Sequence, residues 1–293
     1  MIFPDIDAFR ASGFQAKVCV IGSGPAGTAI ALQLAQAGIP VVMLEAGSDE
    51  VTPDSQDFYR GKVDGDPYFD LDVTRIRLLG GCSNHWAGWC RVMDTHDFDV
   101  RSWIPDSGWP IRRTDLDPYF GLVHNMLDLE DFRPNVPVSD DIDWVQLIKS
   151  PAVHLGEKYR TDLEKSERIA VVMNTMATDL AGDGTRVTAV NLWSRGVAAG
   201  SLVTDHVVVC TGGLENSRLL LWSNEKTNGA VVPKAAALGK YWMEHPQFEP
   251  AVALLFDESA FEWDVQGEAF FSPTAKAMER LGIMNFGARL IKS

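Results

Sequence analysis

Residues 78–90, LLGGCSNHWAGWC, combine residue types that could form a metal site, supply a nucleophile or hold a cofactor. Cys82, His85 and Cys90 could bind a metal, but their spacing has no fourth soft ligand nearby, which argues against a zinc site. His85 could instead be a packed, hydrogen-bonded side chain. The paired glycines could also let the backbone approach a bound cofactor closely. The stretch alone does not decide between these interpretations.

A second pattern lies near the N-terminus. Gly22, Gly24 and Gly27 fit G-x-G-x-x-G. In this motif the first glycine permits a tight turn, the second lets the backbone approach a pyrophosphate, and the third lets helix and strand pack closely. Glu45 follows roughly 20 residues later, the spacing of an acid that binds ribose hydroxyls. The pattern predicts dinucleotide binding and disfavours NADP, but it does not distinguish NAD from FAD.

The segments around this motif have the order that it requires. Residues 17–21 are a β-rich apolar run, residues 28–37 are rich in Ala, Leu and Gln, and residues 41–44 are again apolar. We expect a strand, a helix that ends at Gly38, and a second strand that ends at Glu45. The helix N-terminus would offer free N–H groups to phosphates.

The rest of the chain mixes strands with helices. Residues 48–75 and 131–150 are polar and are expected to be loops, with a helix beginning at Thr114 or Asp115 between them. Asp183-Gly184 predicts a hairpin in the block that starts near Ile169. HVVVCTGG then predicts a strand before a helix. The chain is therefore expected to be an α/β protein.

Composition excludes some function classes. The 293 residues are 46% hydrophobic and carry a formal net charge of -14, which argues against binding to a nucleic-acid backbone. No signal peptide pattern and no long apolar run are present, so a cytoplasmic protein is expected. Cys19 and Cys210 lie in apolar runs and are expected to be buried thiols. Four cysteines in a chain of this length do not indicate a disulfide framework.

Four segments together resemble the N-terminal half of glucose–methanol–choline (GMC) flavoprotein oxidoreductases, in the branch of pyranose 2-oxidase. They are VIGSGPAG with LEAG, LLGGCSNHWAGWC, HVVVCTGGLENSRLLLWS and LGKYWMEHP, in family order. The resemblance implies FAD rather than NAD. It also implies a Rossmann-like FAD-binding domain followed by the start of an α+β substrate domain.

The resemblance implies specific FAD contacts. In the family the Gly-Gly segment lies along the flavin, Ala177 corresponds to a backbone contact to adenine, and Thr211 begins a turn beside the phosphates and ribose. His85 corresponds to the residue that some relatives attach covalently to the flavin. The implied cofactor-binding residues are Gly22, Gly24, Pro25, Ala26, Gly27, Glu45, Ala46, Gly80, Gly81, Ser83, Asn84, His85, Ala177, Thr211, Gly212 and Gly213.

The resemblance also sets the expected domains and activity. Residues 1–236 would form the FAD-binding domain, with surface excursions near 48–75 and 100–165, and residues 237–293 would begin the substrate domain. Family members oxidise an alcohol, in this branch a sugar, by hydride transfer to flavin N5, using a histidine from their C-terminal part. We therefore expect the catalytic residues either in a missing C-terminal half or on a second polypeptide. No metal and no membrane partner are expected, and the alternative is a flavin-binding subunit without turnover.

Overall fold

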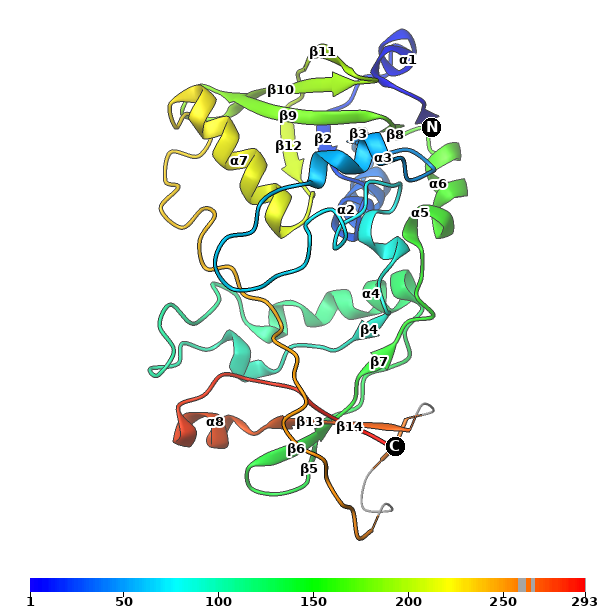
Figure 1. Cartoon of the computed structure of the whole chain (residues 1–293). Coiled ribbons are helices and arrows are strands. Elements are labelled where there is room, and N and C mark those ends of the chain that lie inside the picture. Colours follow the sequence, from blue (N-terminus) through cyan, green and yellow to red (C-terminus); the bar gives the residue numbers. More distant parts are fainter. Residues whose placement is uncertain (258–261, 265–266, 293) are drawn as a thin grey trace. The chain divides into compact units, whose positions relative to one another are not determined.

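The computed structural model describes residues 1–257, 262–264 and 267–292, in two compact units (Figure 1). Unit 1 consists of Met1–Trp86 and Val153–His245, and unit 2 consists of Ala87–Ala152 and Pro246–Ser293. Residues 87–152, expected within the first domain, thus pack with the C-terminal segment. The predicted boundary between 236 and 237 falls within unit 1, and the assignment of a substrate domain stays a prediction.

A five-stranded parallel sheet forms the centre of unit 1. Its order is β1 (Ile2–Phe3), β8 (Ile169–Val172), β3 (Val41–Leu44), β2 (Val18–Ile21) and β12 (His206–Val209). Every residue of β2, β3 and β8 is buried. Such fully apolar strands are typical of a parallel sheet covered on both faces.

One face of this sheet is covered by helices. Val18 and Val41 pack with Ala31 of α2 (Pro25–Gln36) and with Leu163 of α6 (Arg160–Lys165). Side chains of successive strand residues point to opposite faces, so their neighbours contribute to the other face. The βαβ arrangement around α2 confirms the expected α/β class.

The opposite face is covered by a three-stranded antiparallel sheet and by α7. Val42 packs with Leu180 and Val190 of that sheet and with Leu219 of α7. Asp183-Gly184 forms the turn between the first two strands, as predicted. The covering elements are β9 (Thr175–Gly182), β10 (Val187–Ser194), β11 (Val197–Leu202) and α7 (Gly213–Thr227).

Short helices complete unit 1 around the ends of the parallel strands. These elements are α1 (Ile6–Ala11), α3 (Pro53–Gln56), the 3-10 helices η1 (Asp57–Tyr59) and η2 (Gly81–Asn84), and α5 (Leu155–Lys158). Two of them, α3 and η1, lie in the polar segment 48–75 that was expected to be a loop.

Unit 2 is built on a four-stranded antiparallel sheet in the order β14-β13-β6-β5. Trp89 packs edge-on against Phe270 with 5.3 Å between ring centroids. The elements are β4 (Trp89–Cys90), η3 (Thr95–Phe98), η4 (Arg113–Asp115), η5 (Asp117–Tyr119), α4 (Phe120–Leu127), β5 (Val136–Pro137), β6 (Ile142–Val145), β7 (Ile148–Lys149), β13 (Glu268–Pro273), α8 (Ala275–Leu281) and β14 (Ala288–Ile291).

Two expectations about local structure were wrong. Residues 131–150 contain β5, β6 and β7 rather than loop alone, because pairing with β13 and β4 stabilises short strands that are polar on one side. The helix expected over 28–37 begins three residues earlier, at Pro25, which is favoured at the first helical position.

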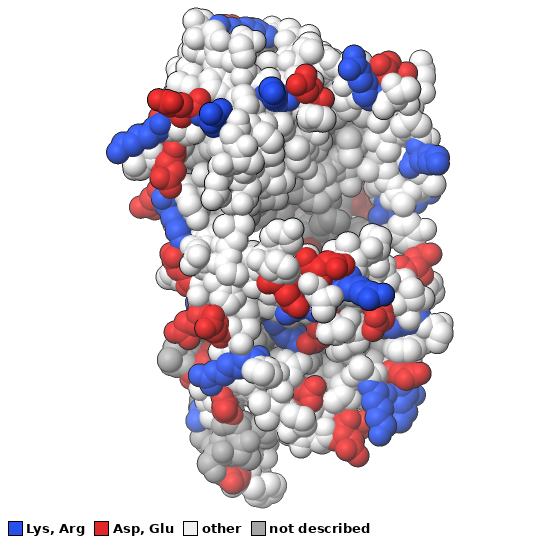
Figure 2. Space-filling view, turned by 180° about the vertical axis from the view of Figure 1, so that it is seen from behind, with Lys and Arg blue, Asp and Glu red and all other residues white. Residues whose placement is uncertain are grey.

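Acidic and basic side chains are interspersed on the face shown in Figure 2. Among the described residues, no helix has the length and apolar character to cross a membrane.

Candidate functional site

A cavity of about 480 Å³ opens in unit 1 at the carboxyl ends of β2, β3 and β12. This edge is where open parallel sheets bind their ligands. We call it the strand-end cavity. Its walls include residues 21–26, 44–46, 74–77, 81–82, 175–177 and 210–215, with Tyr59, Tyr68, Arg218, Leu219 and Trp242.

The three motif glycines have the geometry that their predicted roles require. A Cβ on Gly22 would lie 2.5 Å from the carbonyl oxygen of Cys210, and Gly22 has φ +101°. A Cβ on Gly27 would lie 1.9 Å from the carbonyl oxygen of Gly22, so the strand and helix touch there. Gly24 lines the cavity, and a Cβ on it would meet nothing within 4 Å. Gly24 therefore leaves space open at the wall where a pyrophosphate is expected.

Two helix N-termini reach the cavity. α2 begins at Pro25. Its N-cap residue is Gly24, so no side chain of the N-cap residue caps this helix. α7 begins after Gly212, which has φ +85° and also makes no side-chain capping bond. The first N–H groups of a helix have no partner within the helix, and the helix dipole favours an anion there. Both ends are therefore suited to phosphate oxygens.

Asn216 fixes the turn into α7. Its Oδ1 accepts hydrogen bonds from the Thr211 backbone N–H at 2.8 Å and from Thr211 Oγ1 at 2.7 Å. Thr211, Gly212 and Gly213 all line the cavity. The helical residue Asn216, which the sequence did not assign to the site, thus holds the strand-to-helix turn in shape.

Glu45 is a buried acid in the cavity wall. Its Oε2 accepts hydrogen bonds from Ser23 Oγ at 2.5 Å and from the Ser23 N–H at 3.2 Å, and its Oε1 accepts one from the Gly47 N–H at 2.8 Å. Burial raises the pKa of Glu45, while the bonds from Ser23 and Gly47 act in the opposite direction. A carboxylate oxygen has two lone pairs, so Oε1 retains capacity to accept a ribose hydroxyl.

The Gly-Gly segment packs directly on the dinucleotide motif. The Gly80 N–H donates to Ser23 Oγ at 3.0 Å, and Gly80 has φ +91°. A Cβ on Gly81 would lie 2.9 Å from the Cα of Gly24. Both glycines therefore allow a backbone approach that a larger residue would block. Gly81 and Cys82 of this stretch line the strand-end cavity, as the cofactor interpretation requires.

The other residues of this segment support the loop from within. Ser83 Oγ donates to the Gly80 carbonyl at 2.7 Å and accepts from the Leu155 N–H at 3.0 Å. Asn84 donates to the carbonyls of Leu79 at 2.9 Å and Gly81 at 2.8 Å.

Not all of the predicted contacts lie in the cavity wall. Gly81 and the exposed Cys82 line the cavity, whereas Gly80, Ser83, Asn84 and the exposed His85 do not. Flavin contact by these four residues stays a prediction. All four cysteines of the chain are free thiols.

The cavity wall also contains charged residues that the sequence analysis missed. Glu215 is buried and pairs with Arg75 and, at 2.6 Å, with Arg218. The Arg75 guanidinium lies over the Tyr59 ring, 4.3 Å from its centroid. Arg77 is also buried in the wall. The signal that could have found two of them is the basic pair in TRIRLLGG, immediately before the glycines.

Comparison with known proteins supports this assignment. Residues 15–58, which contain the glycine motif and Glu45, match the family of FAD binding domains. FAD is therefore the cofactor of this chain. The N-terminal part of the chain has a Rossmann-like FAD-binding fold. No curated protein matches the chain.

Several solved structures match the chain at low identity. Pyridoxine 4-oxidase from Mesorbium loti is 17% identical with a TM-score of 0.48, covering 72% of this chain and 52% of that one. An FAD-dependent oxidoreductase from Chaetomium thermophilum is 14% identical with a TM-score of 0.48, covering 72% and 48%. Formate oxidase from Aspergillus oryzae is 14% identical with a TM-score of 0.46, covering 71% and 47%. The chain spans about half the length of these structures.

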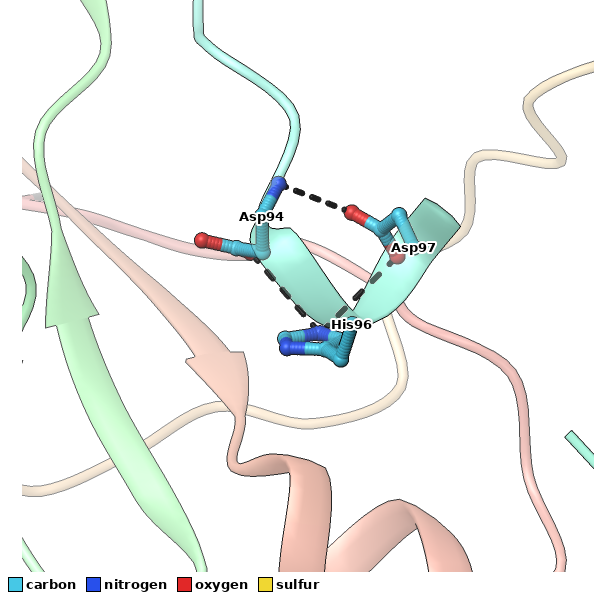
Figure 3. Close-up of side chains that lie close together, drawn as sticks. All are labelled: Asp94, His96 and Asp97. Carbon is cyan, nitrogen blue, oxygen red and sulfur yellow. Dashed lines mark hydrogen bonds and ion pairs between the residues drawn. The ribbon is translucent and has the colours of Figure 1, made fainter. Parts of the chain in front are cut away.

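A second group of polar side chains lies in unit 2. His96 Nε2 is 4.0 Å from Asp94 Oδ2 and 3.8 Å from Asp97 Oδ1 (Figure 3). The carboxylates already have other partners: Arg91 donates to Asp94 at 2.7 Å, and Asn285 donates to Asp97 at 3.1 Å. A guanidinium within the group competes with a metal cation for the carboxylate oxygens. The arrangement therefore does not favour metal binding.

Proposed function

We propose that this chain is the FAD-binding part of a GMC-type oxidoreductase that oxidises an alcohol, and specifically a sugar or glycoside hydroxyl. The observation that carries the proposal is the packing of the Gly-Gly segment on the glycine motif, through Gly80 on Ser23 and Gly81 on Gly24. The resemblance of LLGGCSNHWAGWC to the pyranose 2-oxidase branch supports the sugar substrate. The proposed location is the cytoplasm.

When bound, FAD would supply the hydride acceptor for the oxidation of an alcohol. The residues of this chain would bind and orient it. The N-termini of α2 and α7 would hold the pyrophosphate, and Glu45 would accept hydrogen bonds from ribose hydroxyls. The Gly81–Cys82 backbone would line the flavin side of the cavity. None of the described groups in the cavity wall is a histidine that could take the proton of the alcohol.

We propose that a second polypeptide supplies that histidine. Exposed apolar side chains support this, because large exposed apolar patches often mark interaction surfaces. In the described residues of segment 246–257 of unit 2, which has neither helix nor strand, Phe248, Val252, Leu254 and Phe256 are all exposed. In the same unit, β14 is a sheet-edge strand, which can pair with another chain.

Anaerobic reduction of the bound flavin tests the activity. The protein purified with its partner should lose its oxidised-flavin absorbance when a sugar is added without NAD(P)H. A complex that binds FAD but is reduced by no alcohol would instead be the non-catalytic alternative.

We further propose that His85 can be the covalent attachment point of the flavin. It is exposed and directly follows η2, whose first residues line the cavity. Mass spectrometry of the denatured chain tests this. A flavin mass that stays on the peptide containing His85 supports attachment, and a free flavin contradicts it.

A further inference from the structure

Arg77 is a buried guanidinium without an ionic partner. The residue is 6% exposed, and no carboxylate of a described residue lies within 4.0 Å of its nitrogens. Its Nε donates to Ser55 Oγ at 3.0 Å, whereas the hydrogen bonds of Nη1 and Nη2 go only to Met176 Sδ, at 3.4 and 3.5 Å. The guanidinium also lies 4.9 Å from the centroid of the Phe58 ring. A thioether sulfur is a weak acceptor. A buried charge without strong partners is costly, and a ligand that supplies acceptor atoms would offset that cost.

The other two arginines of the cavity wall differ. Arg75 and Arg218 both pair with Glu215, and Arg75 also donates to the Leu71 carbonyl at 2.9 Å. The Arg218 side chain is 51% exposed, so water can satisfy its remaining donors. Arg77 is therefore the arginine of this wall that is buried and has no carboxylate partner among the described residues.

The surroundings of Arg77 place it at the adenosine end of the cavity. A Cβ on Gly47, two residues after Glu45, would lie 2.2 Å from the Arg77 carbonyl oxygen. Met176 directly precedes Ala177, the residue that corresponds to the adenine contact, and both line the cavity. The Arg77 guanidinium also lies 5.4 Å from the centroid of the Tyr59 ring, on an aromatic wall.

We propose that Arg77 is a specificity-determining residue that recognises the adenosine half of FAD. Its Nη1 and Nη2 groups donate to acceptor atoms of the ribose and adenine, replacing the weak contact with Met176. Glu45 accepts hydrogen bonds from the ribose hydroxyls. The same nucleoside is therefore contacted by an acceptor, Glu45, and by a donor, Arg77. The guanidinium plane can also stack on the purine, as it does on aromatic rings.

Calorimetric titration with FAD and with ADP tests the proposal. ADP carries the adenosine half and lacks the flavin. In Arg77→Met the dissociation constants of FAD and ADP should both rise by the same factor, roughly 10-fold to 100-fold, because charge-assisted hydrogen bonds are lost. Arg77→Lys keeps the positive charge but loses the planar, multidentate guanidinium. The affinity for FAD and ADP should therefore fall less in Arg77→Lys than in Arg77→Met.

Arg168→Met is the matched control, because Arg168 is exposed and donates only to the Gly38 carbonyl, outside the cavity. It should bind FAD and ADP as the wild type does. A purely structural Arg77, which only joins Ser55 to Met176, would lower the melting temperature of the unliganded protein and leave ADP affinity unchanged. Unchanged ADP affinity in Arg77→Met, or in Arg77→Lys if the first variant does not fold, overturns the proposal.

Discussion

Ser23 and Glu45 form a 2.5 Å hydrogen bond from the serine hydroxyl to the carboxylate, inside the wall of the strand-end cavity. The same hydroxyl accepts the N–H of Gly80 at 3.0 Å. One buried oxygen thus links the glycine motif, the ribose-binding acid and the Gly-Gly segment. Three segments far apart in the sequence are held together at the point where the cofactor is expected.

Ser23→Ala should therefore lower both stability and FAD affinity. The change leaves the Gly80 N–H without its acceptor, and an unsatisfied buried polar group costs about 1–3 kcal/mol. Urea denaturation of the unliganded protein measures the loss in the free energy of unfolding. Ser48→Ala is a suitable control, because the Ser48 hydroxyl bonds within an exposed turn. Equal stability of the two variants would contradict the linking role of Ser23.

Gly24 and Gly27 should respond differently to substitution by alanine. Gly24 has φ -64°, and a Cβ there meets nothing within 4 Å, so Gly24→Ala should keep wild-type stability. It should nevertheless weaken FAD binding, because the methyl group occupies space needed by the pyrophosphate. Gly27→Ala places a Cβ 1.9 Å from the Gly22 carbonyl oxygen and should cost about 1–3 kcal/mol or more. Thermal denaturation and FAD titration of both variants check this contrast.

The stability contributed by Glu45 should depend on pH. Burial raises its pKa in the folded protein above the ordinary value of 4.5. The folded state therefore binds this proton more tightly than the unfolded state does. The contribution is fully present below pH 4.5 and is lost as pH rises through the folded pKa. The unfolding free energy of the wild type minus that of Glu45→Gln should fall as pH rises above this value. A difference that grows with pH would contradict the raised pKa.

The cysteines should differ in their reactivity and in their protection by cofactor. Burial raises the pKa of Cys19 to about 12, so it should resist alkylation in the native protein. Cys82 is exposed and lines the cavity beside Gly81, so iodoacetamide should modify it. Added FAD should slow that modification by covering the cavity. Peptide mass spectrometry measures the extent of alkylation at Cys19 and Cys82. If FAD leaves the rate of Cys82 alkylation unchanged, the cofactor binds elsewhere.

Much of the cofactor site could be predicted from local sequence. The spacing of Gly22, Gly24 and Gly27 requires only a strand, a turn and a helix that are contiguous in the chain. The apolar runs around it predict their own secondary structure, and β2 and β3 lie where expected. The match of residues 15–58 to FAD binding domains confirms the cofactor that the family resemblance implied.

The contacts that complete the site could not be predicted from the motif alone. Gly80 reaches Ser23 across 57 positions of sequence, and Arg75 reaches Glu215 across 140, so both depend on the tertiary fold. The strand β6 was missed because Asp143 interrupts its apolar character, and pairing with β13 stabilises it from outside the segment. Nonlocal pairing of this kind overrides local composition.

The central claim is that the strand-end cavity of this chain binds FAD. Native mass spectrometry of the protein purified from its own organism tests it most directly. The account predicts one FAD for each copy of this chain, together with a second polypeptide that carries the catalytic histidine. A chain that is found without flavin, and that takes up none when FAD is added, would contradict the account.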